Sequence, residues 1–559
     1  MKRQMTQALA LAASAALGAS LVQAQGRGGS EWTTSSFDAQ RTGSIRTDPR
    51  ISVGTMLKPG AFGPFTFLWK MKLEHDPGAA GALTQPILLD RLIGFRGFKS
   101  IAFVGTASET VHAVDTDFGA PLWKYHINYS ASFPPIKGYS ADCPGGLTAA
   151  LSRPTAIAPA PAGAAGGGGR GGRSGGGVGE PGKGSLTLAT AGQGRGGGAG
   201  ARGAAPPAAP PGAAPGSAAA AAGAVPGGLP GGARAGGPGA GAPFTPGGDA
   251  AYVVGSDGYL HALNVQNGWD NMTPALFLPA NTRATGLIIA TLAEGGAVAY
   301  AATTRGCSSQ LDAVWAMDLA SPQKTVSAFN AKGAIIAGTA GPAIGRDGSV
   351  YIVTADGESP LSNAVVALEP KTLTLKGSVT VPQAKFASSP LVFQSNDKDF
   401  LVTAGGGKLF LFDTRSLSNG PIATSASYGP AGFEPGALAS WLDAQGVRWI
   451  AAPSSRGIAT MKITEQDGKL AFLPGWTSRD IAAPLPPLVV NGVMFAASGG
   501  TRAAPGVLYA IDAATGKDLW NSARTITSTV RGGLSSGQGN VYVPAADGTL
   551  YAFGFAIEK

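Results

Sequence analysis

The stretch Ala510-Ile511-Asp512-Ala513-Ala514-Thr515-Gly516-Lys517-Asp518-Leu519-Trp520 joins an apolar strand end, an acidic turn residue, a glycine and a tryptophan. A second copy, with the same order of residue types, occupies residues 113–123. Weaker copies of the strand end and its turn residue recur at intervals of about 50 residues, at residues 262–264, 316–318, 367–369, 411–413, 461–462 and 553–554. Such self-similarity indicates a repeat architecture, in which each unit buries its apolar face only against its neighbours. The eight copies therefore predict eight repeated units.

Each unit contains the pattern of four short strands. In the last complete unit the predicted strands are residues 487–490, 493–497, 507–512 and 517–520. The first two are separated by Asn491-Gly492, a strong hairpin signal because both central positions of such a turn favour positive φ. Four-stranded units repeated around an axis are propeller blades. We therefore predict an all-β fold, an eight-bladed β-propeller of four-stranded antiparallel blades.

The chain also contains a strand that can close the ring. The eighth unit stops near residues 553–554 with three strands, whereas residues 65–73 form an apolar stretch before the first unit. Pairing this N-terminal strand with the last blade would remove two open sheet edges at once. We expect the ring to close in this way.

The remaining segments divide the chain further. Residues 1–24 combine Lys2 and Arg3 with an apolar run and a small-residue end, which is typical of a secretory signal, with an uncleaved anchor as the alternative. Residues 25–64 form an N-terminal lead-in, and residues 65–157 with 249–559 form the propeller. Residues 158–248 are a Gly/Ala/Pro-rich insert in blade two that we expect to be disordered, between a first strand near residues 154–157 and a second strand at residues 251–254.

The charge pattern argues against a nucleic-acid partner. The formal net charge is +9, but the signal region contributes +2 and the insert +5, which leaves +2 for the folded part. A nucleic-acid-binding domain would show a clustered basic face. The Arg-Gly content of the insert leaves open a loose contact with anionic polymers. No stretch after residue 24 is long and apolar enough to span a membrane. We expect the protein to be a monomer.

Two cysteines, Cys143 and Cys307, occur in a chain that we expect to be exported. A single disulfide between them is the simplest expectation in an oxidising compartment, and two free thiols are the alternative. The sequence contains no Cys-x-x-Cys-His haem attachment motif and no zinc-type spacing.

The repeats at residues 113–123 and 510–520 resemble those of pyrroloquinoline quinone (PQQ) dehydrogenases and their non-catalytic relatives. The opening residues 32–42, with Asp38-Ala39-Gln40-Arg41-Thr42-Gly43, resemble the segment before the first blade in many of these proteins. The resemblance implies either an eight-bladed quinoprotein alcohol dehydrogenase, with PQQ and calcium at the ring centre, or a cofactor-free relative such as the outer-membrane assembly lipoprotein. The adjacent cysteine pair of the dehydrogenases is absent here, and no local motif matches their other site residues. Function therefore does not follow from the fold.

A calcium site needs six to eight oxygen ligands, some of them anionic. The positions expected nearest the axis are small or neutral: Gln85, Thr148, Gly286, Gly341, Ser389, Ala437, Leu485 and Gly532. The carboxylates that could reach a propeller face are those of Glu109, Asp142, Asp257, Asp356, Glu358 and Asp547, which we interpret as turn residues. The candidate arginines are Arg153, Arg283, Arg305, Arg456 and Arg531. Arg531 is the one best placed to bind a carboxylate or quinone oxygen in the central funnel, with a salt bridge to a turn aspartate as the alternative.

The histidines and tryptophans fit structural roles. His112 and His261 occupy the third-strand position that tyrosines fill in other units, which predicts packing rather than chemistry. Trp69, Trp123 and Trp520 recur at outer strands, which predicts packing between blades.

We therefore expect an exported PQQ-like repeat propeller that acts as a binding or assembly scaffold in the cell envelope and needs no cofactor. Its expected partner is a protein, glycan or small molecule held by loops on a propeller face, in the periplasm or outside the cell. The alternative is a PQQ- and calcium-dependent quinoprotein dehydrogenase that oxidises alcohols or sugars and passes electrons to a separate carrier.

Overall fold

The structure is a computed structural model that describes residues 31–58, 60, 63–74, 83–94, 97–127, 146–157, 249–292, 295–304, 312–466 and 468–556. The predicted signal region, the insert, and Cys143 and Cys307 with their predicted disulfide lie outside these residues. Among the described residues, no helix has the length and apolarity needed to cross a membrane.

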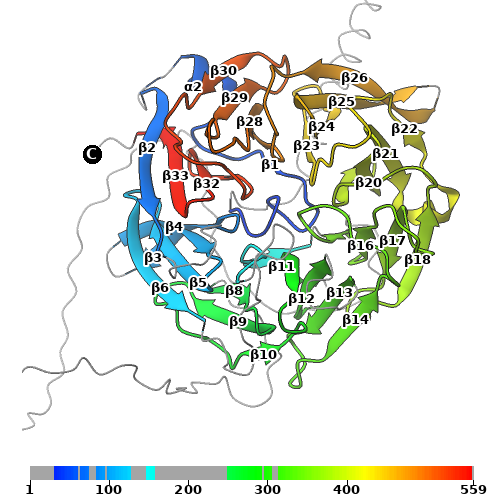
Figure 1. The fold of residues 1–559 in the computed structure, drawn as a ribbon, viewed down its shortest axis with the longest axis horizontal. Coiled ribbons are helices and arrows are strands. Elements are labelled where there is room, and N and C mark those ends of the chain that lie inside the picture. The colour runs from blue at the N-terminus through cyan, green and yellow to red at the C-terminus, as the bar shows by residue number, and fades with distance from the viewer. Residues whose placement is uncertain are drawn as a thin grey trace, which may run out of the picture. The chain divides into compact units, whose positions relative to one another are not determined.

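The described residues form eight sheets arranged as a closed ring, which confirms the predicted eight-bladed propeller (Figure 1). The strands of a blade are lettered A to D from the axis outward. Turns between A and B and between C and D lie on one side of the ring, which we call the AB face. Turns between B and C and the links between blades lie on the other side, the BC face.

The first four blades have these strands. Blade 1 contains β3 (Ile87–Gly94), β4 (Gly97–Gly105), β5 (Thr110–Asp115) and β6 (Ala120–His126), and blade 2 contains β8 (Ala250–Val254), β9 (Tyr259–Asn264) and β10 (Ala275–Leu276). Blade 3 contains β11 (Arg283–Thr291), β12 (Ala297–Thr304), β13 (Ala313–Asp318) and β14 (Val326–Asn330), and blade 4 contains β15 (Ala343–Ile344), β16 (Val350–Val353), β17 (Ala364–Leu368) and β18 (Leu375–Thr380).

The last four blades follow in chain order. Blade 5 contains β19 (Leu391–Ser395), β20 (Lys398–Gly405), β21 (Lys408–Asp413) and β22 (Ala423–Thr424), with the 3₁₀ helix η2 (Thr414–Asn419) after β21, and blade 6 contains β23 (Ala439–Leu442), β24 (Arg448–Ser454), β25 (Gly457–Gln466) and β26 (Lys469–Thr477). Blade 7 contains β27 (Leu488–Val490), β28 (Val493–Ala497), β29 (Leu508–Asp512) and β30 (Asp518–Asn521), and blade 8 contains β31 (Ser535–Gly537), β32 (Asn540–Pro544) and β33 (Thr549–Phe555).

The predicted closure of the ring is confirmed. The fourth strand of blade 8 is the N-terminal β2 (Phe65–Lys72), which pairs antiparallel with β33 from Phe65 opposite Phe555 to Lys72 opposite Thr549. The two ends of the propeller therefore share one sheet (Figure 1).

The predicted first strand of blade two, residues 154–157, is wrong. Among the described residues, an isolated bridge between Ser152 and Tyr252 joins the chain just before this stretch to blade 2, whereas β7 (Pro154–Ala156) pairs in parallel with β11 of blade 3. Ser152 and Tyr252 exchange both backbone hydrogen bonds. The next residue that would have to donate to β8 is therefore Pro154, which has no N–H.

A tryptophan of one blade docks on a glycine of the next, which explains the Gly and Trp of the repeat. Trp123 Nε1 donates to the carbonyl of Val265 at 2.9 Å, and a Cβ added to Gly268 would lie 2.6 Å from the Trp123 ring. Trp69 with Gly119 and Trp476 with Gly516 repeat this contact. Packing between blades is thus confirmed for Trp69 and Trp123, and Trp520 packs on Phe65 and Phe553 of blade 8.

Within the lead-in, residues 32–48 run along the inner strands of the ring, and we call them the axial segment. It includes β1 (Ser44–Ile45), which pairs in parallel with β27 near the middle of the ring (Figure 1), and α2 (Val53–Leu57) follows it. Its carbonyls accept hydrogen bonds of 2.8–3.0 Å from the backbone N–H groups of Leu88, Arg153, Ile344, Val392, Ser440, Val489 and Asn491. Two side chains of the segment add contacts with further blades. Thr34 Oγ1 donates to Leu287 O of blade 3, and Asp48 Oδ2 accepts from Gly539 N of blade 8. One short segment therefore contacts every blade except blade 2, which it reaches through the stretch around Arg153.

Ring closure can be tested at Phe65, which is 4 % exposed and packs against Phe495, Trp520 and Phe555 with ring centroids 5.0–5.6 Å apart. We expect Phe65→Ala to lower the free energy of unfolding by about 3–5 kcal/mol, because it empties a packed aromatic site at the seam. The matched control is Phe67→Ala on the same strand, where the side chain is 36 % exposed. Equal losses in urea denaturation of the two variants would contradict a seam closed by β2.

Candidate functional site

The ring centre is the first candidate, because the resemblance implies a cofactor there. Several of the neutral positions expected near the axis make contacts between neighbouring blades. Gly286 of blade 3 and Gly341 of blade 4 lie back to back, both with positive φ, and a Cβ on Gly286 would lie 2.3 Å from the carbonyl oxygen of Ala340. Ser389 Oγ accepts from Ala340 N at 2.9 Å, which links blade 4 to blade 5. These positions are small because backbone meets backbone there.

Arg41 is a charged residue that lies at the centre, and it is 1 % exposed. Its guanidinium donates to four neutral oxygens: Pro342 O at 2.8 Å, Gly286 O at 2.8 Å, Ser35 O at 2.6 Å and Thr34 Oγ1 at 3.1 Å. Arg41 thus connects the axial segment to blades 3 and 4. Burial lowers the pKa of Arg41 to about 9, although the charge of Asp38 opposes this shift.

Asp38 turns the axial segment back on itself beside Arg41. Its carboxylate accepts from Thr42 N at 2.9 Å and from Thr42 Oγ1 at 2.6 Å. Burial raises the pKa of Asp38 despite these hydrogen bonds. Arg41 is therefore bound by the axial segment and by the inner blades, and Asp38 is bound by Thr42 of the same segment.

The described residues of the ring centre do not fit PQQ with calcium. Calcium requires several convergent oxygen ligands, some of them anionic. The inner positions are neutral, and the carboxylate of Asp38 is engaged by Thr42. Among the described residues, no three His, Cys, Asp or Glu side chains are grouped so as to hold a metal ion.

Arg531, the arginine predicted for the central funnel, is exposed and follows Val530, which bridges to Ala545. Two residues later, Gly533 lies against the side chain of Gln85. Its binding role stays a prediction. Of the other candidate arginines, Arg153 forms an ion pair with Glu31 and Arg456 one with Asp480 at 2.7 Å, whereas Arg305 lies outside the described residues.

Two of the candidate carboxylates come together on the BC face between blades 1 and 2. Glu109 is 6 % exposed and accepts a hydrogen bond from Ser256 N at 2.5 Å, next to Asp257. Burial raises the pKa of Glu109, and the charge of Asp257 adds to the shift although the hydrogen bond from Ser256 opposes it. Asp257 Oδ1 accepts from Tyr259 N at 3.0 Å, as predicted for a turn aspartate. The pair therefore links two turns.

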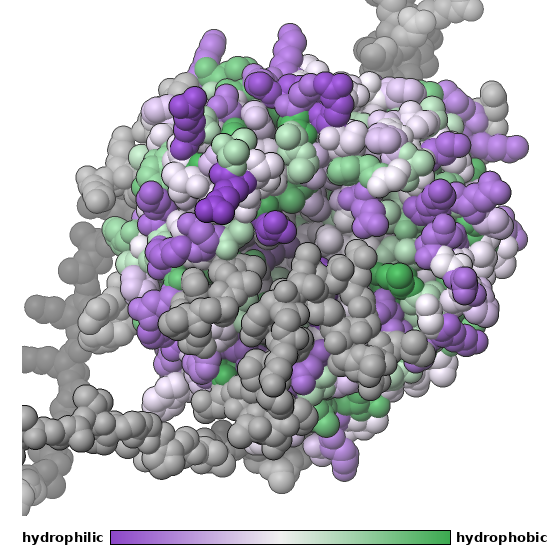
Figure 2. All heavy atoms as spheres, in the orientation of Figure 1, coloured by the Kyte–Doolittle hydropathy of each residue, from purple (hydrophilic) through white to green (hydrophobic). Residues whose placement is uncertain are grey.

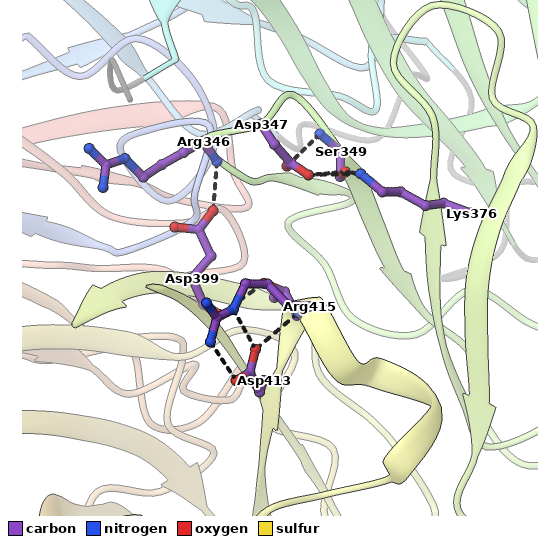
Figure 3. A network of polar contacts seen from close by, with 8 residues as sticks. Arg346, Asp347, Ser349, Lys376, Asp399, Asp413 and Arg415 are labelled. Atoms are coloured by element: carbon purple, nitrogen blue, oxygen red, sulfur yellow. Dashed lines mark hydrogen bonds and ion pairs between the residues drawn. The ribbon is translucent and has the colours of Figure 1, made fainter. Parts of the chain in front are cut away.

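Charged groups also gather between blades 4 and 5 (Figure 3). Asp399 of blade 5 accepts from the backbone N–H of Arg346 in blade 4 at 2.7 Å, and burial raises the pKa of Asp399. Lys376 Nζ lies 2.8 Å from Asp347 Oδ2 and 2.7 Å from Ser349 Oγ. Burial would raise the pKa of Asp347, but the hydrogen bonds from Lys376 and Ser349 outweigh it and hold the pKa below its usual value. Of these contacts, the hydrogen bond from Arg346 to Asp399 joins blades 4 and 5, whereas those of Lys376 lie within blade 4.

The predicted packing roles of the two third-strand histidines are confirmed. His112 Nε2 lies 2.9 Å from Glu74 O, and His261 Nδ1 lies 3.0 Å from Asp270 Oδ2. His112 and His261 are both buried.

Figure 2 shows hydrophilic side chains distributed around a face that is hollowed near its middle.

Comparison with known families supports this architecture. Residues 448–556, from β24 to the end of blade 8, match the family model described as outer membrane protein assembly factor BamB. No curated protein sequence matches the chain.

Solved structures share the fold at low sequence identity. The quinohemoprotein alcohol dehydrogenase from Comamonas testosteroni aligns with a TM-score of 0.52 and 12% identity over 95% of this chain and 81% of its own. The quinohemoprotein alcohol dehydrogenase ADHIIG from Pseudomonas putida HK5 gives 0.53 and 12% over the same shares. A europium-containing methanol dehydrogenase gives 0.52 and 11% over 94% of this chain and 98% of its own. The chain therefore shares its propeller fold with these proteins, and residues 448–556 are similar to the assembly-factor family.

The importance of Arg41 can be measured by urea denaturation. We expect Arg41→Met to lower the free energy of unfolding by about 2–4 kcal/mol, because four buried oxygens lose their donor. Arg502→Met, at an exposed arginine, is the control and should change stability by less than about 0.5 kcal/mol. A similar small change for both variants would show that Arg41 does not hold the centre together.

The pH dependence of stability tests the burial of Glu109. Because its pKa is higher in the folded than in the unfolded state, its stabilising contribution is complete below the ordinary pKa of 4.5 and is lost as the pH rises through the folded pKa. Glu109→Gln should therefore be more stable than the native protein at pH 7, and the difference should vanish below about pH 4. Glu358→Gln, at an exposed glutamate, should follow the native profile. A native-like profile for Glu109→Gln would refute the shift.

Proposed function

We propose that this protein is a binding or assembly scaffold of the cell envelope that needs no cofactor. The proposal rests on the axial segment, whose backbone carbonyls accept hydrogen bonds from the inner strands. The guanidinium of Arg41 in this segment donates to oxygens of the same chain. The match of residues 448–556 to an assembly-factor family supports the same role.

The loops of the two faces are the surfaces left for a partner. We propose that they hold a protein, glycan or small molecule, in the periplasm or outside the cell, and that the scaffold is a monomer. The charge of +2 outside the signal and insert supports a partner other than nucleic acid.

The test adds PQQ and calcium to the purified protein and follows the melting temperature and the reduction of a redox dye by alcohols or sugars. The proposal expects neither a shift nor dye reduction. A ligand at 100 times its Kd would stabilise the folded state by about 2.7 kcal/mol, which is easily seen as a shift. Calcium alone is the control. A shift that requires both components, accompanied by dye reduction, would establish the quinoprotein dehydrogenase instead.

A further inference from the structure

A tryptophan on the AB face of blade 2 departs from the repeat pattern. In blade 1 the tryptophan of the repeat, Trp123, stands four residues after Gly119. In blade 2 the residue four positions after Gly268 is Met272, which packs against the apolar cluster between blades 2 and 3. Trp269 instead follows Gly268 directly, in the turn between β9 and β10, and is 73 % exposed. Its ring is therefore available to a partner.

The turn that carries Trp269 is held by its own backbone and by the neighbouring blade. Trp269 O accepts from Asn264 N at 2.7 Å, and Trp269 N donates to Asn267 Oδ1 at 2.9 Å. From blade 1, Trp123 Nε1 donates to Val265 O at 2.9 Å. Because the backbone of the turn is already ordered, a ligand that stacks on the ring costs little conformational entropy.

Three exposed side-chain amides belong to the same turn, those of Gln266, Asn267 and Asn271. Asn267 Oδ1 accepts from Trp269 N, and Asn271 Oδ1 accepts from Asn264 Nδ2 at 3.3 Å. Among the described residues, the Nδ2 groups of Asn267 and Asn271 have no hydrogen-bond partner. An amide nitrogen carries two N–H donors and no charge. The turn therefore offers neutral donors beside an aromatic ring.

The one charged side chain of residues 264–272, that of Asp270, is engaged within the fold. Asp270 Oδ1 accepts from Ala262 N at 3.2 Å, and Asp270 Oδ2 lies 3.0 Å from His261 Nδ1 and accepts from Tyr125 OH at 3.3 Å. The exposed groups of the turn are thus an indole ring and uncharged amides. They favour an uncharged ligand that has both an apolar face and hydroxyl groups.

We propose that this turn binds a neutral oligosaccharide of β-linked pyranoses, with the C–H face of one sugar on the Trp269 ring and its hydroxyl groups bonded to the amides of Asn267 and Asn271. Such sugars carry their hydroxyl groups at the ring edge, and their C–H hydrogens suit the negative face of an aromatic ring. Phe118, in the corresponding turn of blade 1 on the same face, is 70 % exposed, which favours a chain of several sugars. The proposal rests on the scaffold function above, because it names the partner of a propeller face.

The probes for the test are cellohexaose and chitohexaose, each titrated calorimetrically into the full chain. We expect at least one of them to bind with a Kd of about 1 mM or tighter. Trp269→Ala should weaken binding about tenfold because the stacking surface is lost, and Trp269→Phe should weaken it less because an aromatic ring remains. Asn267→Asp keeps the Oδ1 acceptor of the turn but removes the N–H donors, and should weaken binding about fivefold.

Leu276→Ala is the matched control and should bind like the native protein, because Leu276 is a 57 % exposed apolar residue of the same blade outside this turn. The melting temperature of each variant shows whether it is folded, and Asn267→Asp keeps the test decisive if Trp269→Ala is not. No binding of either probe up to about 10 mM, or undiminished binding by Trp269→Ala, would overturn the proposal.

This titration contains neither PQQ nor calcium, so its outcome is separate from the test of the scaffold function. Failure of the sugars to bind would leave a scaffold with a partner of another class. A PQQ-dependent activity would instead remove the scaffold function, whatever the affinity for the sugars.

Discussion

The structure depends on the backbone hydrogen bonds between the axial segment and the inner strands of the blades. The inner strand of each blade has one edge that faces the axis, and its N–H and C=O groups need partners there. In this protein the carbonyls of residues 32–45 accept from the inner strands of successive blades. The same segment is linked to blades 3 and 4 through Arg41. The N-terminal part of the chain is therefore a component of the propeller core.

This arrangement separates the centre of the ring from its faces. The centre holds charged groups, but their hydrogen bonds are used within the fold. A protein that resembles quinoprotein enzymes in fold therefore uses Arg41 and Asp38 at its centre for hydrogen bonds to its own chain.

The repeat pattern predicted the fold because each repeated residue is required by a turn or by a contact with the next blade. Asn491-Gly492 specifies a hairpin, and a glycine four residues before a tryptophan is required where the tryptophan of the preceding blade docks. The closure by residues 65–73 followed from counting strands. The assignment of residues 154–157 failed because a short apolar run does not say which sheet it joins, and the missing N–H of Pro154 decided the outcome. The centre could not be predicted either, since Arg41 meets Pro342 across 301 residues without any local signal.

The most direct test is the amide hydrogen exchange of the inner-strand residues whose N–H groups donate to the axial segment, namely Ile344, Val392, Ser440 and Val489, followed by mass spectrometry of the native protein. Because these bonds join the segment to blades 4 to 7, we expect the four amides to exchange as slowly as those of the buried second strand of blade 7, β28. Exchange of these amides as fast as that of the exposed turn at residues 501–505, while β28 stays protected, would contradict the packing of the axial segment against the inner strands.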